Sequence, residues 1–266
     1  MSGLWTLWRS VYGQRHLFWE LVCHGVQGRF AGSFAGLLWT VLHPLAHIAI
    51  YNFLFSLVFR IRMPAQETGT DSFLIFFLTG YCPWLCFAEA VSRSTGSVVD
   101  NAVLVTKVFF PVEVLPFSTV TAGFLIHTGA WVLALLLMAA MGYSHISWLL
   151  MPLVLGILYV FALGLSLLLS ALCVFIRDVR EIITVVLTMW FYATPILYPI
   201  GFVPSEIGWL LAANPLTPMV QAARSVLLHH RIPVSDLLHG ALWAGGLYIV
   251  GAAFFGRSRR AFGDVL

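Results

Sequence analysis

Few side chains in this sequence could do chemistry, and the spacings of common catalytic sites are missing. A phosphate-binding P-loop needs a lysine followed by serine or threonine at the end of a glycine-rich turn. The single lysine, Lys107, is instead preceded by Thr106 and followed by valine. Glu89 and Glu113 stand near predicted helix ends, and neither has an acidic partner in the adjoining span. We therefore expect no catalytic site, no metal site and no cofactor bound by this chain.

Two pairs of residues have a four-residue spacing that suits metal or redox sites. His43 and His47 flank Pro44 on one helix face, where they could bind a metal or relay a proton. The simpler interpretation is that both are polar positions facing the interior of a helix bundle. Cys82 and Cys86 share a face in an apolar run, which favours packing thiols over a redox or metal role.

The composition shows what kind of elements must carry these residues. Of 266 residues, 60% are apolar and 9% are charged, whereas about 25% are charged in a typical globular domain. The mean hydropathy is +0.93. So few charges cannot cover the surface of a soluble domain, which excludes soluble, disordered, nucleic-acid-binding and disulfide-scaffold proteins. The chain is predicted to be an all-α polytopic membrane protein with one transmembrane domain over 1–266.

Stretches without Asp, Glu, Lys or Arg locate the membrane spans. A crossing helix needs about 20 mostly apolar residues. Residues 114–176 form a charge-free stretch of 63 residues, which as one helix would run about 95 Å, so it must fold back at 142–147, GYSHIS. The sequence therefore predicts six transmembrane helices, over 37–59, 73–95, 113–141, 149–173, 181–200 and 236–256.

The segment before the last span is apolar but too broken to cross. Pro215 and Pro218 interrupt 207–223, and irregular backbone at membrane depth needs protein or water around it. We expect 201–235 to form two short re-entrant or interfacial helices on the outer side.

Lysine and arginine positions give the orientation. With the N-terminus inside, ten basic residues fall in inner segments and four in outer segments. This bias predicts that both termini are cytoplasmic in a multi-pass plasma (bacterial inner) membrane protein. The N-terminal region, 1–30, has Leu4, Leu7, Trp8 and Val11 on one face, which suits an amphipathic helix lying on membrane lipid. The alternative is a helix packed on its own bundle.

The inner segment 96–112 has the pattern of a short helix. Small and polar residues come first, apolar residues follow at Val99 and Val103, and Pro111 ends the segment. Asp100 near the start is favourably placed for the helix dipole. A short helix between two spans, ending in a positive charge, could rest on a cytoplasmic partner.

Five segments carry a resemblance to a known family. They are GSFAGLLWTVLHPL (32–45), FLTGYCPWLCFAEAVSRSTGSVVDNAVLVTKVFFPVEVLP (77–116), FIRDVREI (175–182), TPILYPI (194–200) and NPLTPMVQAARSVLL (214–228). Together they resemble the permease subunit of type-2 ATP-binding-cassette exporters of the polysaccharide class, which export O-antigen, capsule or teichoic acid.

The resemblance implies a homodimer with two copies of a separate ATPase subunit, which carries the ATP and Mg. It implies that a lipid-linked glycan moves outward through a path between the two permease copies. It also implies that 96–110 is a coupling helix loop that docks the ATPase, with the docking residues Ser97, Val98, Val99, Asp100, Asn101, Leu104 and Lys107. The two short helices in 201–235 would line the outer mouth, through Trp209, Asn214, Pro215 and Arg224.

Aromatic faces stack on sugar rings, so we expect aromatic residues on the path. The favoured residues are Trp39, Trp190, Tyr192 and Tyr198, and the alternative is that they are interfacial belt and packing residues. Two other functions stay open. One is an exporter of a drug or small lipid from the same superfamily. The other is an ATP-independent secondary transporter or channel, which the lack of mid-span acids disfavours.

Overall fold

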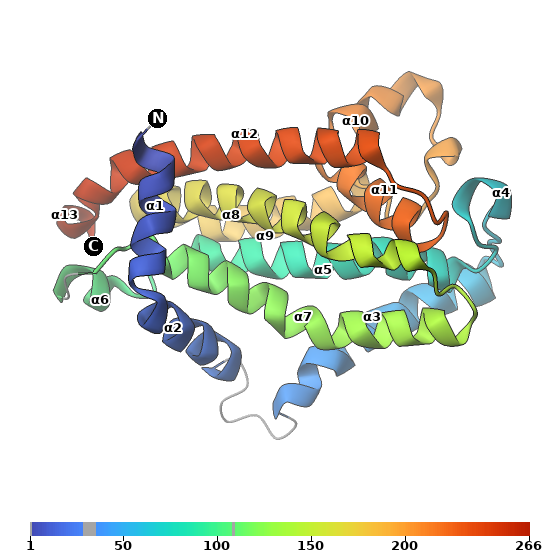
Figure 1. The fold of residues 1–266 in the computed structure, drawn as a ribbon, viewed down its shortest axis with the longest axis horizontal. Coiled ribbons are helices and arrows are strands. Elements are labelled where there is room, and N and C mark those ends of the chain that lie inside the picture. Colours follow the sequence, from blue (N-terminus) through green and yellow to red (C-terminus); the bar gives the residue numbers. More distant parts are fainter. Residues whose placement is uncertain (1, 29–35, 108–109) are drawn as a thin grey trace.

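The structure is a computed structural model that describes residues 2–28, 36–107 and 110–266. Within these residues the chain is helical and has no strand. Its long helices run lengthwise beside one another (Figure 1). They are α3 (Trp39–Asn52, continued by a π-helical turn over Phe53–Val58), α5 (Phe73–Thr95), α7 (Val114–Ala140), α8 (Met151–Phe175) and α12 (Val234–Ser258).

Five helical segments of the described chain are long and apolar enough to cross a membrane. They are Trp39–Val58, Ala65–Thr95, Val114–Ala140, Ile146–Phe175 and Val234–Val265. Gly142, with φ of +88°, lies in the turn between the third and the fourth, where the sequence predicts the fold-back.

The predicted span over 181–200 is helical for a shorter stretch. Helix α9 (Val179–Ala193) has 15 residues, or about 22 Å, against a hydrocarbon core of about 30 Å. It ends where Thr194, in extended conformation with ψ of 138°, precedes Pro195, because proline disfavours helical backbone in the residue before it. The sixth span therefore stays a prediction.

Helix α5 lies at the centre of the bundle. Most of its side chains are buried, and it packs against α3, α7, α8, α9 and α11 (Leu216–Leu227). Phe73, Phe77 and Tyr81 form a ladder of stacked rings along one face, with centroids 5.8 and 4.7 Å apart. Phe55 of the first span stacks on Phe73 at 4.9 Å, so aromatic contacts tie this span to α5.

Both chain ends lie at the same end of the bundle. Helix α1 (Ser2–Gly13) crosses the long helices there, beside α6 (Ala102–Lys107) and α13 (Phe262–Val265), while α4 (Ala65–Thr68) and α10 (Gly208–Ala213) lie at the opposite end (Figure 1). Leu7 and Val11 are buried, and Trp8 packs edge-on against Phe117 at 5.0 Å. Helix α2 (Arg15–Gly28) lies along α7. Part of the predicted amphipathic face thus packs on the bundle, and the placement in the membrane plane stays a prediction.

Helices α8 and α12 touch through two glycines. A Cβ added at Gly164 would lie 2.5 Å from the backbone nitrogen of Tyr248, and one added at Gly251 would overlap the carbonyl oxygen of Gly164. Small residues let backbones approach closely, which is a common basis of helix association in membranes.

This contact predicts that Gly251→Ala destabilises the protein. The added methyl group forces α8 and α12 apart, at a cost of about 1–3 kcal/mol, and lowers the Tm of the purified protein in detergent. The matched control is Gly246→Ala on the same helix, where an added Cβ meets nothing within 4 Å. There the higher helix propensity of alanine leaves the Tm unchanged or raises it. Equal Tm values for the two variants would contradict the close contact.

Candidate functional site

The segment between α5 and α7 folds as a turn followed by a short helix. The turn runs from Gly96 to Asn101, where the backbone N–H of Asp100 donates to the carbonyl of Gly96 at 2.9 Å. The side-chain amide of Asn101 donates to the carbonyl of Ser97 at 2.8 Å, and helix α6 begins only at Ala102. A side chain that bonds nearby backbone competes with helical hydrogen bonds. In the described residues, the helix expected within 96–110 is therefore limited to Ala102–Lys107 and is preceded by a turn. Residues 108 and 109 lie outside the described chain.

The predicted docking residues of this 96–107 loop fall into three groups by exposure. Ser97 and Val98 are buried and anchor the loop to the bundle, whereas Asp100 and Lys107 are exposed. The predicted residues Val99, Asn101 and Leu104 are half-buried. Val103 is 67% exposed and was not among the predicted docking residues, although its place in the apolar pattern of the loop could have indicated it. The loop therefore presents an apolar residue with charged neighbours at the end of the bundle that holds both termini.

A buried carboxylate fastens this end of the bundle. The side chain of Glu113, at the start of α7, is 1% exposed. Its Oε1 accepts a hydrogen bond from the Ser10 hydroxyl at 2.5 Å, and Arg259 Nη1 donates to its two oxygens at 2.9 and 3.1 Å. A carboxylate in this position needs such partners to offset the loss of water. The group joins α1, α7 and the end of α12.

A cleft of about 450 Å³ opens between α3, α5 and α9; we call it the α9 cleft. Its lining mixes aromatic rings with hydroxyl and imidazole groups, unlike the lipid-facing surfaces. The Tyr51 and Tyr192 hydroxyls lie 3.3 Å apart across it. The lining residues are His43, His47, Tyr51, Tyr81, Trp84, Leu85, Ala88, Glu89, Ser92, His127, Thr184, Leu187, Thr188, Phe191 and Tyr192.

The two histidines of α3 lie on the wall of this cleft. Their ring centroids are 4.6 Å apart, and His47 Nδ1 lies 3.1 Å from the carbonyl oxygen of His43. Among the described residues, no group of three or more His, Cys, Asp or Glu side chains has the arrangement of a metal site. Both histidines line the cleft, as expected for polar positions that face the interior of a bundle.

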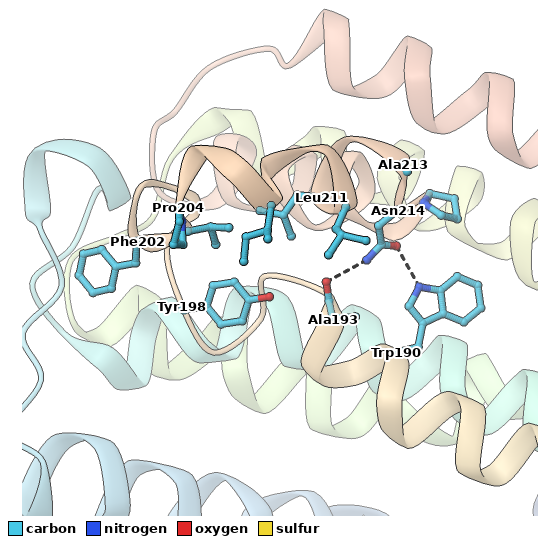
Figure 2. Close-up of a pocket in the computed structure, with 12 residues that line it drawn as sticks. Trp190, Ala193, Tyr198, Phe202, Pro204, Leu211, Ala213 and Asn214 are labelled. Carbon is cyan, nitrogen blue, oxygen red and sulfur yellow. Dashed lines mark hydrogen bonds between the residues drawn. The ribbon is translucent and has the colours of Figure 1, made fainter.

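A second cavity, of about 560 Å³, lies beneath α10; we call it the α10 cavity. Figure 2 shows apolar side chains around it, with Asn214 at one end. Asn214 Oδ1 accepts from Trp190 Nε1 at 2.9 Å, and its Nδ2 donates to the carbonyl of Ala193 at 3.2 Å and to Thr194 Oγ1 at 3.0 Å. These bonds hold the end of α9 against the segment that joins α10 to α11.

The four aromatic residues predicted for a path do not line the same opening, although the Tyr198 hydroxyl donates to the carbonyl of Tyr192 at 3.1 Å. Tyr192 lines the α9 cleft, whereas Trp190 and Tyr198 line the α10 cavity. Trp39, 45% exposed at the start of α3, lines neither. The prediction missed other aromatic residues of the cleft. A sequence signal existed for one of them, because Tyr51 continues the four-residue spacing of His43 and His47 along α3.

The residues predicted for the outer helices lie in different surroundings. Asn214 and Pro215 line the α10 cavity, and Trp209 is 64% exposed on α10. Arg224 of α11 is 3% exposed and lies inside the bundle. Its Nη2 donates to the carbonyl of Ile196 at 3.0 Å, and its Cζ lies 3.7 Å above the ring of Phe76. Arg224 thus holds the segment after α9 against α5 and α11, and it does not line a surface opening.

The sequence is similar to known proteins over nearly its whole length. It matches the family of ABC-2 type transporters over residues 16–228. It is 33% identical over 259 residues to the O-antigen export system permease protein RfbA of Myxococcus xanthus, covering 95% of each chain. A permease of the same name from Klebsiella pneumoniae is 31% identical over 243 residues, covering 90% of each chain. The polysialic acid transport protein KpsM of Escherichia coli is 24% identical over 209 residues, covering 76% of this chain and 78% of KpsM. The chain therefore belongs to the ABC-2 type transporter family.

Proposed function

We propose that this chain is the membrane subunit of an exporter that moves a lipid-linked polysaccharide from the cytoplasmic to the outer side of the bacterial inner membrane. Relatives over nearly the full length are named as permeases of O-antigen export. In this family the ATPase is a separate subunit, and ATP and Mg are assigned to it. The observation that carries the proposal is the α9 cleft, an open surface lined by aromatic rings together with hydroxyl and imidazole groups.

The lining of the α9 cleft suits a sugar chain. Aromatic rings such as Tyr81 and Trp84 offer flat apolar faces for sugar rings, and the hydroxyls of Thr184 and Thr188 offer hydrogen bonds. Polar side chains within membrane helices usually face a bundle interior or a water-filled cavity. Many weak contacts of this kind hold a polymer in place without trapping it, as transport through a path requires.

A second copy of the chain would close the cleft into a path. The cleft opens on the face formed by α3 and α9, and the residues of the first span are largely unburied in one copy. Helix α9 buries only one stripe and exposes apolar residues such as Val185 and Met189. Two such faces related by a two-fold axis make an isologous contact. We therefore propose a homodimer in which α9 is the sixth membrane helix of each copy.

The 96–107 loop is the proposed docking site for the ATPase. It lies at the same end of the bundle as both termini, and the distribution of basic residues supports a cytoplasmic position for this end. ATP can move the bundle only if the docked ATPase binds two arrangements of it unequally, so the loop must pass a displacement to the helices that line the cleft.

Docking through this loop predicts that Val103→Glu weakens the complex. Burying a new carboxylate in place of an exposed valine at an apolar contact disfavours binding, and a cost of about 1.4 kcal/mol lowers affinity about tenfold. Co-purification with the partner ATPase and permease-stimulated ATP hydrolysis measure the effect. Val265→Glu, an exposed valine at the same end of the bundle, is the control. Unchanged recovery of the ATPase with Val103→Glu would contradict this docking site.

A path along the α9 cleft predicts that Thr188→Trp blocks export. The indole fills the space beside Phe191 and Tyr192, so surface polysaccharide falls about tenfold or more while lipid-linked glycan accumulates inside, which corresponds to about 1.4 kcal/mol or more. The measurement is complementation of a strain lacking this chain, with membrane levels and ATPase recovery followed in parallel. Leu242→Trp on α12, at a side chain 74% exposed and outside the cleft, is the control. Normal export by Thr188→Trp would exclude the cleft as the path. Normal glycan export by the strain lacking the chain would favour the drug or small-lipid exporter.

A further inference from the structure

An ion pair joins the 96–107 loop to helix α9. Arg180 Nη2 donates to Asp100 Oδ1 at 2.6 Å, between residues 80 positions apart in the sequence. Arg180 is the second residue of α9, and Asp100 lies in the turn that precedes α6. The pair therefore connects the proposed docking loop directly to a helix of the cleft wall.

The backbone of the loop is shaped to admit this arginine. The guanidinium lies across Gly96, where a Cβ would overlap Nη2 and would stand 2.5 Å from Cζ and 2.7 Å from Nε. Gly96 is buried beneath it. A side chain at residue 96 would force the guanidinium out of this position, so the observed placement of Arg180 requires a residue without a side chain here.

Helix α9 is hydrogen-bonded to other segments near its two ends and packs on the bundle along one stripe between them. Val179, Ile183, Leu187 and Phe191 form its buried stripe, with the four-residue spacing of one helix face. Its neighbouring stripe, Thr184, Thr188 and Tyr192, lines the α9 cleft. At the far end Trp190 is bonded to Asn214, and at the near end Arg180 is bonded to Asp100. A shift of the near end therefore changes the position of the cleft wall.

The ion pair is poorly placed to stabilise the fold. The side chains of Arg180 and Asp100 are 44% and 56% exposed, and ion pairs that exposed contribute at most about 1 kcal/mol. A short charge-assisted hydrogen bond nevertheless fixes the relative position of two groups. The pair is therefore better suited to fixing the position of α9 relative to the loop than to stabilising the fold.

We propose that Arg180 is a positioning residue that ties α9 to the docking loop through Asp100 and thereby passes the displacement of the docked loop to the wall of the path. This inference rests on the proposed function, because it assumes that an ATPase moves the loop. Because Gly96 has no side chain, the guanidinium can lie against its backbone and reach Asp100.

The first test measures polysaccharide exported per ATP hydrolysed by the full complex. Arg180→Gln is expected to lower this ratio about fivefold or more, the lower range of coupling between sites, while ATPase recovery stays unchanged. Arg177→Gln removes an exposed charge in the turn just before α9 and is the control. In a double-mutant cycle, Arg180→Gln combined with Asp100→Asn should export per ATP as Asp100→Asn alone does, because both variants break the same contact. An unchanged ratio in Arg180→Gln, or losses that multiply, would overturn the proposal.

The second test follows the cleft wall itself. A Thr188→Cys reporter, in a chain whose exposed Cys23 is replaced by serine, reports access of a water-soluble maleimide. ATP is expected to change the labelling rate of the reporter in the complex, and Arg180→Gln should abolish that change. An equal ATP-dependent change with Arg180→Gln would overturn the connection. Failure of the proposed function is a different result, in which the chain without substitutions shows no ATP-dependent export.

Discussion

The structure depends first on the packing of α5, whose side chains contact other helices on most sides. Most of its side chains are buried, and buried side chains are closely packed, so this helix must fit all its neighbours at once. Helix α5 contacts five other helices, forms one wall of the α9 cleft and leads directly into the 96–107 loop. A change in its position therefore alters the packing, the cleft and the loop together.

Polar side chains join distant segments at both ends of the bundle. At the end with both termini, Glu113 binds Ser10 and Arg259, and Asp100 binds Arg180. These bonds join segments that are distant in sequence without using the hydrophobic effect, which does not drive helix association in lipid. Towards the α10 end, Asn214 and Arg224 perform the same task by binding backbone and indole groups. The hydroxyls and rings of the α9 cleft are a further polar set, and they face an open space.

Five of the predicted spans correspond to long apolar helices, because charge-free length is a local property. The predicted span over 181–200 includes Pro195, whereas α9 ends before this proline, and the proline itself is the signal for that end. The turn at the start of the 96–107 loop depends on a side-chain hydrogen bond, from Asn101 to the carbonyl of Ser97. The α9 cleft could not be predicted from spacing alone, because α3, α5 and α9 meet only through the tertiary fold. The burial of Arg224 was missed for the same reason: its acceptor, the Ile196 carbonyl, lies on another segment.

The proposed docking of a separate ATPase requires the 96–107 loop to lie on the cytoplasmic side. A cysteine at Val103, with exposed Cys23 replaced by serine, reports this position when modification by a membrane-impermeant maleimide is compared between intact cells and inside-out vesicles. We expect no modification in intact cells, modification in vesicles stripped of the ATPase, and protection when the ATPase is added back. Modification of Val103→Cys in intact cells would place the loop outside and rule out docking of the ATPase there.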